Sequence, residues 1–280
     1  MTDPDSERPV ELRRRASGSL SPPLMARLPG IPGLISWLAM IALVAVAYLR
    51  DLGRNPYGFF CDEALIGVQA SQLLDGTRPE GTFSLFYSHF GTTAGALPVY
   101  ATAPFVWIFG LSEFSVRFAS VFFMVATFAV LFLTFRHLEL ATPWLPVVIF
   151  ALTPIVIHIS RVNFGHAPSL FLLALGYHLY LRGRDARRIW LVIGGGVAIG
   201  LSAYGYPGFY IATPVFLGIV VLTELVFLRF RPRQAKALVA LAGAALLCIV
   251  PIVYRGLTDP EFSKRFDDKD QAGYGLVSSE

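Results

Sequence analysis

Two adjacent carboxylates, Asp62 and Glu63, are the residues whose types and placement best suit chemistry. They lie in a long loop, residues 50–115, between segments that read as lipid-buried helix, and Phe59 and Phe60 directly precede them. Partial desolvation by lipid and aromatic rings raises the pKa of a carboxyl group and makes its carboxylate a better general base. The sequence therefore makes Asp62 and Glu63 the candidate catalytic residues, with Asp62 as the base.

Asp62 also has a purely structural interpretation. From Glu63 to Leu74 the apolar residues recur at helical spacing, and Asp75-Gly76 ends the run, which predicts an amphipathic helix lying against the membrane. An aspartate just before such a helix caps its open N–H groups and complements its dipole. The two roles are compatible, and the residues alone leave both open.

Side chains that could bind a phosphate group lie elsewhere in the chain. Arg161 stands between two apolar runs, away from the other basic clusters, and the arginine fork suits a phosphate group. Snorkelling of its side chain is the alternative interpretation. His89 in the long loop and His166 are further candidates, although His89 equally reads as an ordinary loop histidine.

Several other classes of function find no support in the sequence. There is no Walker motif, dinucleotide fingerprint or Ser-His-Asp pattern. The net charge of +4 does not indicate nucleic-acid binding, because the basic residues sit at the ends of apolar runs and form no stripe. Cys61 lies in the loop and Cys248 inside an apolar run, so both read as free thiols.

The elements that must position these residues are membrane-spanning helices. The chain has 280 residues, of which 55% are apolar and 15% charged, and a mean hydropathy of +0.59, which is too apolar for a soluble domain. Residues 1–30 are polar and basic and read as a disordered cytosolic tail. Runs long enough to cross a bilayer cover residues 31–49, 118–135, 141–160, 162–181, 189–223 and 237–254.

The number of spans depends on two of these runs. The run over residues 189–223 is too long for one span, and Tyr204 to Gly208 marks a turn within it, which gives seven spans in total. The first run contains Ala45-Val46-Ala47, so removal of a signal peptide is the rival interpretation there. The sequence thus predicts an all-α integral membrane protein, a polytopic helix bundle occupying residues 31–254.

The distribution of arginine and lysine sets the predicted orientation. If the short apolar segment from Ala94 to Gly110 lies at the outer interface as a helix, nearly every basic cluster faces the cytosol. The N-terminus is then cytosolic and the protein is a multi-pass protein of the plasma membrane. The segments predicted to lie outside are residues 50–115, 160–167 and 255–280, the last of which reads as the start of an outer loop of a longer polypeptide.

Short motifs, considered together, resemble those of a known enzyme family. The chain is similar to the N-terminal half of GT-C membrane glycosyltransferases, in the group of bacterial relatives of the dolichyl-phosphate-mannose protein mannosyltransferases, glycosyltransferase family 39. The motifs occur in the order Asp62-Glu63, Leu97-Pro98, Phe109 to Glu113, Val116 to Ser120, Ser160-Arg161, Tyr204 to Pro207 and Asp259 to Phe262 followed by Arg265.

The resemblance implies transfer of a sugar from a polyprenyl-phosphate donor to an acceptor hydroxyl on a protein or glycolipid, at the outer face and with inversion. It also implies that Asp62 is the base, and that Arg161, with His89, His166 or Lys264 and Arg265, binds the donor phosphate. In some members the loop carboxylate helps to bind a metal. Many relatives carry a second acid where this chain has His166, so a divalent metal cofactor stays open.

Two further functions compatible with the sequence are kept as alternatives. One is an enzyme of the same type that transfers a pentose or an aminosugar rather than a hexose. The other is a transporter or flippase of lipid-linked sugars, although few charged residues lie deep in the spans, as a polar path across the membrane would require.

Overall fold

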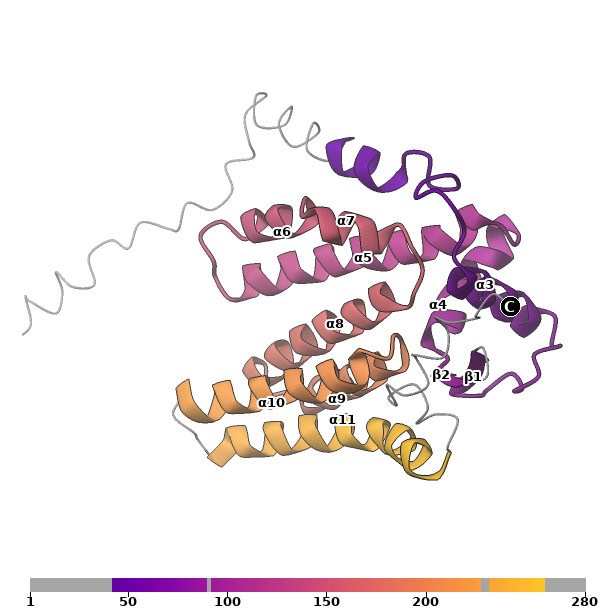
Figure 1. Cartoon of the computed structure of the whole chain (residues 1–280). Coiled ribbons are helices and arrows are strands. Elements are labelled where there is room, and N and C mark those ends of the chain that lie inside the picture. The colour runs from indigo at the N-terminus through magenta and orange to yellow at the C-terminus, as the bar shows by residue number, and fades with distance from the viewer. Residues whose placement is uncertain (1–41, 90–91, 228–231, 260–280) are drawn as a thin grey trace, which may run out of the picture. The chain divides into compact units, whose positions relative to one another are not determined.

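The computed structural model describes residues 42–89, 92–227 and 232–259 (Figure 1). The chain divides into two compact units, Met1–Val46 and Ala47–Glu280. The first unit contributes only residues 42–46 to the described part, and the elements from α3 onward all belong to the second. The predicted cytosolic tail, most of the first predicted span and nearly all of residues 255–280 lie outside the described residues.

Helices dominate the described part, and three of them are long and apolar enough to cross a membrane. They are α5 (Glu113–His137), α10 (Phe209–Phe227) and α11 (Pro232–Thr258). α4 (Leu97–Phe109) and α9 (Ile189–Leu201) are apolar but shorter. The predicted all-α membrane class is therefore confirmed, whereas the described residues show three such helices and not seven.

α5 begins and ends at residues that suit its dipole. The Ser112 side chain accepts a hydrogen bond from the Ser115 backbone N–H at 3.2 Å and so caps the helix. Glu113 lies in the first turn, and Arg136 and His137 lie in the last, where each complements the local partial charge. Because of these polar ends, α5 extends beyond the apolar run in both directions.

The run over residues 141–160, predicted as one span, is two short helices. α6 (Trp144–Ala151) and α7 (Pro154–Ser160) are separated at Thr153, which is extended with φ −66° and ψ 124°. Proline disfavours the helical conformation in the residue before it and has no N–H to continue the ladder. The Thr153-Pro154 step therefore breaks the run, and the expectation of a single helix was wrong.

The break predicted in the run over residues 189–223 is confirmed. α8 (His166–Asp185) is followed by α9, a 3-10 turn η1 (Ser202–Tyr204) and then α10. The turn ends at Tyr204, and the marked segment, Tyr204 to Gly208, connects it to α10.

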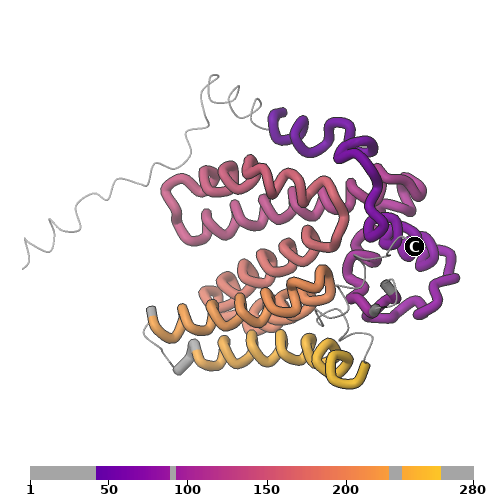
Figure 2. The backbone as a smooth tube through the Cα atoms, in the orientation of Figure 1, coloured from indigo at the N-terminus to yellow at the C-terminus, as the bar shows by residue number. Residues whose placement is uncertain are grey.

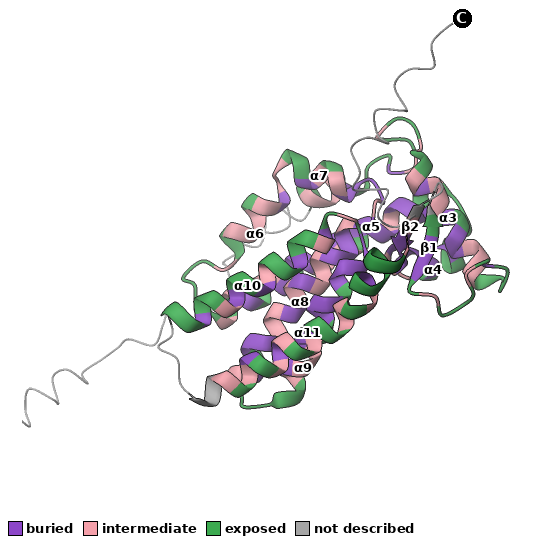
Figure 3. Ribbon diagram, turned by 60° about the horizontal axis from the view of Figure 1, so that its bottom comes forward, coloured by how far each residue is buried: buried purple, intermediate pink, exposed green. Residues whose placement is uncertain are grey.

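A hydrophobic core lies between the helices α8, α9, α10 and α11 (Figure 3). Tyr180, Ile199 and Leu241 are among its fully buried side chains. Other faces of α10 and α11 carry exposed apolar side chains, including Ile219 and Leu247. A helix that is apolar on its buried and its exposed faces is typical of a membrane span, because lipid covers the outer face.

The long loop is more structured than predicted. It contains α3 (Cys61–Leu74), then the antiparallel strands β1 (Phe86–His89) and β2 (Thr92–Gly95), and then α4. The hairpin is a departure from a purely helical fold. α4 lies within the segment Ala94 to Gly110 that was predicted to form an interfacial helix.

α3, α4 and the two strands lie together at one end of the long helices (Figure 1, Figure 2). Polar contacts join elements at that end and at the other. At one end, α3, α4 and the hairpin meet the start of α5 and the end of α11, where the Thr93 hydroxyl donates to Asp259 Oδ2 at 3.3 Å. At the other end, His137 Nε2 and Asp185 Oδ2 are 2.8 Å apart. These are called the loop end and the opposite end below.

Candidate active site

The carboxylate pair lies in the first turn of α3. The helix begins at Cys61 with Phe60 as its N-cap, so Asp62 is its second residue and not the cap that was predicted. The capping contact is made by Glu63, whose Oε2 accepts a hydrogen bond from the Phe60 backbone N–H at 3.3 Å. The structural role foreseen for Asp62 therefore belongs to its neighbour, although both acids still complement the helix dipole.

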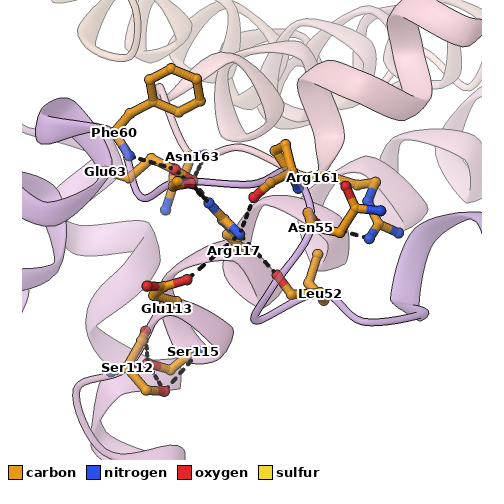
Figure 4. A network of polar contacts seen from close by, with 12 residues as sticks. Leu52, Asn55, Phe60, Glu63, Ser112, Glu113, Ser115, Arg117, Arg161 and Asn163 are labelled. Carbon is orange, nitrogen blue, oxygen red and sulfur yellow. Dashed lines mark hydrogen bonds and ion pairs between the residues drawn. The ribbon is translucent and has the colours of Figure 1, made fainter.

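Glu63 is fully buried in an ion pair with Arg117 (Figure 4). Arg117 Nε lies 3.2 Å from Glu63 Oε1, and Nη2 lies 3.2 Å from Oε2, which is the two-pronged geometry of a strong arginine–carboxylate pair. Both side chains are completely excluded from solvent. A buried ion pair of this kind tolerates the loss of neither partner, because the other charge would remain uncompensated.

Asn163 connects Glu63 to the connection between α7 and α8. Its backbone N–H donates to Glu63 Oε1 at 2.9 Å, so the two carboxylate oxygens accept four hydrogen bonds in all. Its side-chain amide donates to Thr102 Oγ1 at 2.8 Å and to the Val116 carbonyl at 2.9 Å. Glu63 and Asn163 thus join α3, α4, α5 and the connection before α8 in one network.

Arg117 uses all five of its N–H donors. Besides Glu63, it donates to the backbone carbonyls of Leu52 at 3.2 Å, Pro56 at 3.1 Å and Gly58 at 2.5 Å. These carbonyls belong to the irregular segment just before α3. Arg117 therefore fixes both the start of the helix and the chain that leads into it.

Arg161, the predicted phosphate ligand, holds the same segment from another side. Its guanidinium donates to the carbonyls of Ala47 at 2.7 Å, Arg50 at 2.6 Å and Asn55 at 2.9 Å, and the residue is only 7% exposed. Burial lowers the pKa of Arg161, and the charge of nearby Arg117 lowers it further. The observed contacts of Arg161 are therefore structural.

The predicted histidines have different positions. His166 is the first residue of α8 and lies at the loop end, where its ring stacks on Tyr206 with centroids 4.0 Å apart. His89 ends strand β1, but its side chain lies outside the described part. Lys264 and Arg265 also lie outside the described residues. The structure thus brings Asp62, Glu63, Arg161 and His166 to one end.

The sequence did not identify three residues that hold the loop end together: Arg117, Asn163 and Arg78. Buried Arg78 donates to Gln69 Oε1 at 3.2 Å and to the Phe86 carbonyl at 2.9 Å, which ties the hairpin to α3. The available signal was an arginine directly before an apolar run, as at Arg117, although its local acid Glu113, four residues earlier and 3.8 Å away, is only one of its partners. No local signal marks Asn163, because its role depends on distant partners.

The described side chains do not assemble a metal site. Within the described ranges, no group of three or more His, Cys, Asp or Glu side chains is arranged to hold a metal ion. The oxygens of Glu63 are already surrounded by nitrogen donors. Cys61 and Cys248 are free thiols, as predicted, with Cys61 exposed at the start of α3.

Comparison with known proteins places the chain in a family. The model of the family described as dolichyl-phosphate-mannose-protein mannosyltransferase matches residues 85–259, more than half of the chain. Arg117, Arg161 and His166 lie within the match, whereas Asp62 and Glu63 precede it. No curated protein and no solved structure matches. With its membrane-crossing helices and its family-typical motifs, the chain belongs to the dolichyl-phosphate-mannose-protein mannosyltransferase family of membrane glycosyltransferases.

Proposed function

We propose that the chain transfers a sugar from a polyprenyl-phosphate carrier to a hydroxyl group of a protein or glycolipid, at the outer face of the plasma membrane and with inversion. Family membership supports the class of reaction and of donor. The apolar helices support a lipid-borne donor, because a polyprenyl tail inserts in the bilayer and leaves its phosphate at the surface. The loop end is the proposed place of reaction.

The main observation behind this proposal is that Asp62 and Glu63 have different surroundings. Glu63 is buried and its oxygens are occupied by four donors, so it serves to position the first turn of α3. Asp62 is in the same turn and is partly exposed. Of the two acids, Asp62 is therefore the one that an acceptor can reach.

The proposed step needs one base. The Asp62 carboxylate takes the proton of the acceptor hydroxyl, whose oxygen forms a bond to the anomeric carbon. The bond between that carbon and the donor phosphate oxygen breaks, and polyprenyl phosphate leaves from the face opposite the attack. This direct displacement inverts the anomeric centre, whereas retention through a covalent intermediate would require a carboxylate nucleophile.

The developing charge on the leaving phosphate requires donors at the loop end. We keep Arg161 as the first candidate, because only three of its five N–H groups are used by the described residues. His166 and His89 remain further candidates, as hydrogen-bond donors rather than as part of the buried network. In this arrangement Arg161 both fixes the loop and faces the donor.

The proposed topology has seven spans with a cytosolic N-terminus. It is supported by the arginines of the opposite end, in the last turns of α5 and α8, which fit the cytosolic side. The carboxylate pair lies at the loop end, which is then outside. Impermeant maleimide should label the exposed native thiol of Cys61 in intact cells of a Cys248→Ala variant, and protection of Cys61 would reverse the proposed orientation.

The direct test of the function is the Asp62→Asn variant in lipid nanodiscs. With dolichyl-phosphate mannose as donor and a serine-rich peptide as acceptor, we expect the turnover rate to fall by at least about a hundredfold, which is the usual contribution of a general base. Donor binding should be retained, because the substitution leaves the Glu63–Arg117 pair intact.

The matched control is Asp75→Asn, at the other end of α3, where the residue is exposed and serves as the C-cap. Its turnover should equal that of the wild type. Full transfer by Asp62→Asn would refute the assignment of the base. Movement of donor across the bilayer without any transfer by the wild type would favour a flippase instead.

A further inference from the structure

Four rings lie in a row at the loop end and connect the start of α3 to the turn after α9. The Phe60 and Phe164 rings meet edge to face with centroids 5.4 Å apart, and Phe164 lies 6.2 Å from His166. His166 then stacks on Tyr206 at 4.0 Å and an interplanar angle of 25°. Phe60 precedes Asp62 by two residues, so one end of the row is next to the proposed base.

The Tyr206 end of the row is held in place by a close contact of two backbones. A Cβ on Gly205 would lie 1.8 Å from Ser169 Oγ and 2.6 Å from the Gly165 carbonyl oxygen. Only glycine lets the turn approach α8 this closely. Tyr206 is therefore presented by a fixed piece of backbone, and its side chain is 38% exposed.

The row is aromatic but not purely apolar. His166 Nδ1 is buried and has no hydrogen-bond partner among the described residues, which favours the neutral tautomer with its proton on Nε2. A protonated ring would bury an unpaired N–H at Nδ1, at a cost in free energy. The row thus combines ring faces and edges with an imidazole donor and the Tyr206 hydroxyl.

This combination matches the chemistry of a sugar. A pyranose ring has a C–H face, which packs against aromatic rings, and a rim of hydroxyls, which need a few placed polar groups. A phosphate would instead need cations, and the four side chains of the row include no arginine or lysine.

Other exposed rings at this end are different. Tyr57 is 98% exposed and Phe83 is 93% exposed, and neither has a ring partner among the described residues. Such isolated rings suit the water–lipid interface. The rings of the row contact one another, and His166 and Phe164 are half-buried.

We infer that Tyr206 and His166, continued by Phe164 and Phe60, form a platform that docks a pyranose ring at the loop end, the same end as Asp62. The inference rests on the proposed function and adds a sugar-binding site to it. The ring belongs either to the lipid-linked donor or to a glycan acceptor, since both present the same face. The platform positions the sugar, while Asp62 performs the proton transfer.

The test compares three variants of the full chain in nanodiscs: Tyr206→Leu, Tyr206→Phe and Tyr57→Leu. Binding of dolichyl-phosphate mannose and of dolichyl phosphate is measured separately, together with KM for a mannosylated peptide acceptor. For a donor site, Tyr206→Leu should weaken binding of dolichyl-phosphate mannose by about fivefold to tenfold and leave dolichyl phosphate unchanged. For an acceptor site, the KM for the acceptor should rise by a similar factor instead.

Tyr206→Phe keeps the ring and should retain most of the affinity that Tyr206→Leu loses. Unchanged binding of dolichyl phosphate by Tyr206→Leu shows that misfolding is not the cause of its loss. Tyr57→Leu should change none of the constants. Any of three results would overturn the platform. Tyr57→Leu could change the binding constants as much as Tyr206→Leu does, or Tyr206→Leu could weaken binding of dolichyl-phosphate mannose and of dolichyl phosphate equally. The third is that Tyr206→Leu changes neither donor binding nor the KM for the acceptor. If Asp62→Asn is inactive while Tyr206→Leu is unchanged, the function stands and the platform falls. A wild type without binding or transfer would overturn both.

Discussion

Each end of the described part holds an arginine paired with a glutamate, but the two arginines organise different kinds of structure. At the loop end, Arg117 and Glu63 are completely buried, and the other N–H groups of Arg117 donate to backbone carbonyls of an irregular segment. At the opposite end, Arg184 is 18% exposed and pairs with the side chains of Glu224 and Asp185. It therefore ties α8 to α10.

This difference predicts how much each end depends on its arginine contacts. A regular helix satisfies its own backbone, so an ion pair between helices adds stability without determining their conformation. The segment before α3 has few internal hydrogen bonds, and arginine side chains replace the missing ones. Loss of an arginine contact should thus be more harmful at the loop end than at the opposite end.

The largest effect is expected from Glu63→Gln. The amide turns one acceptor oxygen into a donor that faces N–H groups, so the free energy of unfolding should fall by roughly 3–5 kcal/mol. Transfer should be lost as well, because the turn that carries Asp62 is no longer fixed. Chemical denaturation measures the loss of stability, the transfer assay measures the loss of activity, and trypsin cleavage after exposed Arg54 reports the release of the loop.

The double variant Glu63→Gln with Arg117→Met is the control for this pair. Removing both charges should restore part of the lost stability, since no unpaired charge remains buried. A single Glu63→Gln variant within about 1 kcal/mol of the wild type would show that the pair is not what holds the loop.

A smaller effect is expected from Glu224→Gln at the opposite end. Arg184 keeps its contact with Asp185 at 2.8 Å and has access to solvent, so the cost should be about 1–2 kcal/mol with unchanged turnover. Thr223→Val is the matched control, because among the described residues that hydroxyl donates to the Ile219 carbonyl of its own helix. A loss of transfer in Glu224→Gln would remove the functional distinction between the ends.

The smallest effect concerns pH. Burial by itself would raise the pKa of Asp185, but hydrogen bonding and charge from Arg184, with a contribution from His137, lower it overall. The carboxylate therefore stabilises the folded chain fully above its unfolded pKa of about 3.9, and this contribution is lost as pH falls through the lower folded value.

Because Asp185 is partly exposed, the contribution should be only a few tenths of a kcal/mol. Unfolding of the wild type and of Asp185→Asn between pH 6 and pH 3 tests it. The free energy of unfolding of the wild type should exceed that of the variant at pH 6, and the difference should shrink towards pH 3. A difference that stays constant with pH would contradict the assigned role of Asp185.

Local signals accounted for most of the helices. Hydropathy is a property of neighbouring residues, so α5, α10 and α11 and the turn between α9 and α10 followed from the sequence. Thr153-Pro154 was also a local signal, and its effect on the helix was underestimated. The hairpin was missed because its strands have four residues each and pair only with one another.

The roles of Asp62 and Glu63 could not be separated from the sequence. Both are acids at the start of the same helix, and what distinguishes them is which one meets Arg117. That contact depends on the packing of α3 against α5. The same holds for Arg161, whose charge was noticed but whose carbonyl partners, in the segment before α3, have no side-chain signature.

The sequence separations within the network also determine an order of events during synthesis. Glu63 is bonded by a side chain 54 positions later and by a backbone N–H 100 positions later. A chain that emerges N-terminus first must therefore keep the Glu63 carboxylate hydrated until α5 is in the membrane and the connection before α8 has been made. The segment that carries Asp62 is synthesised before α5 and can be completed only after α7.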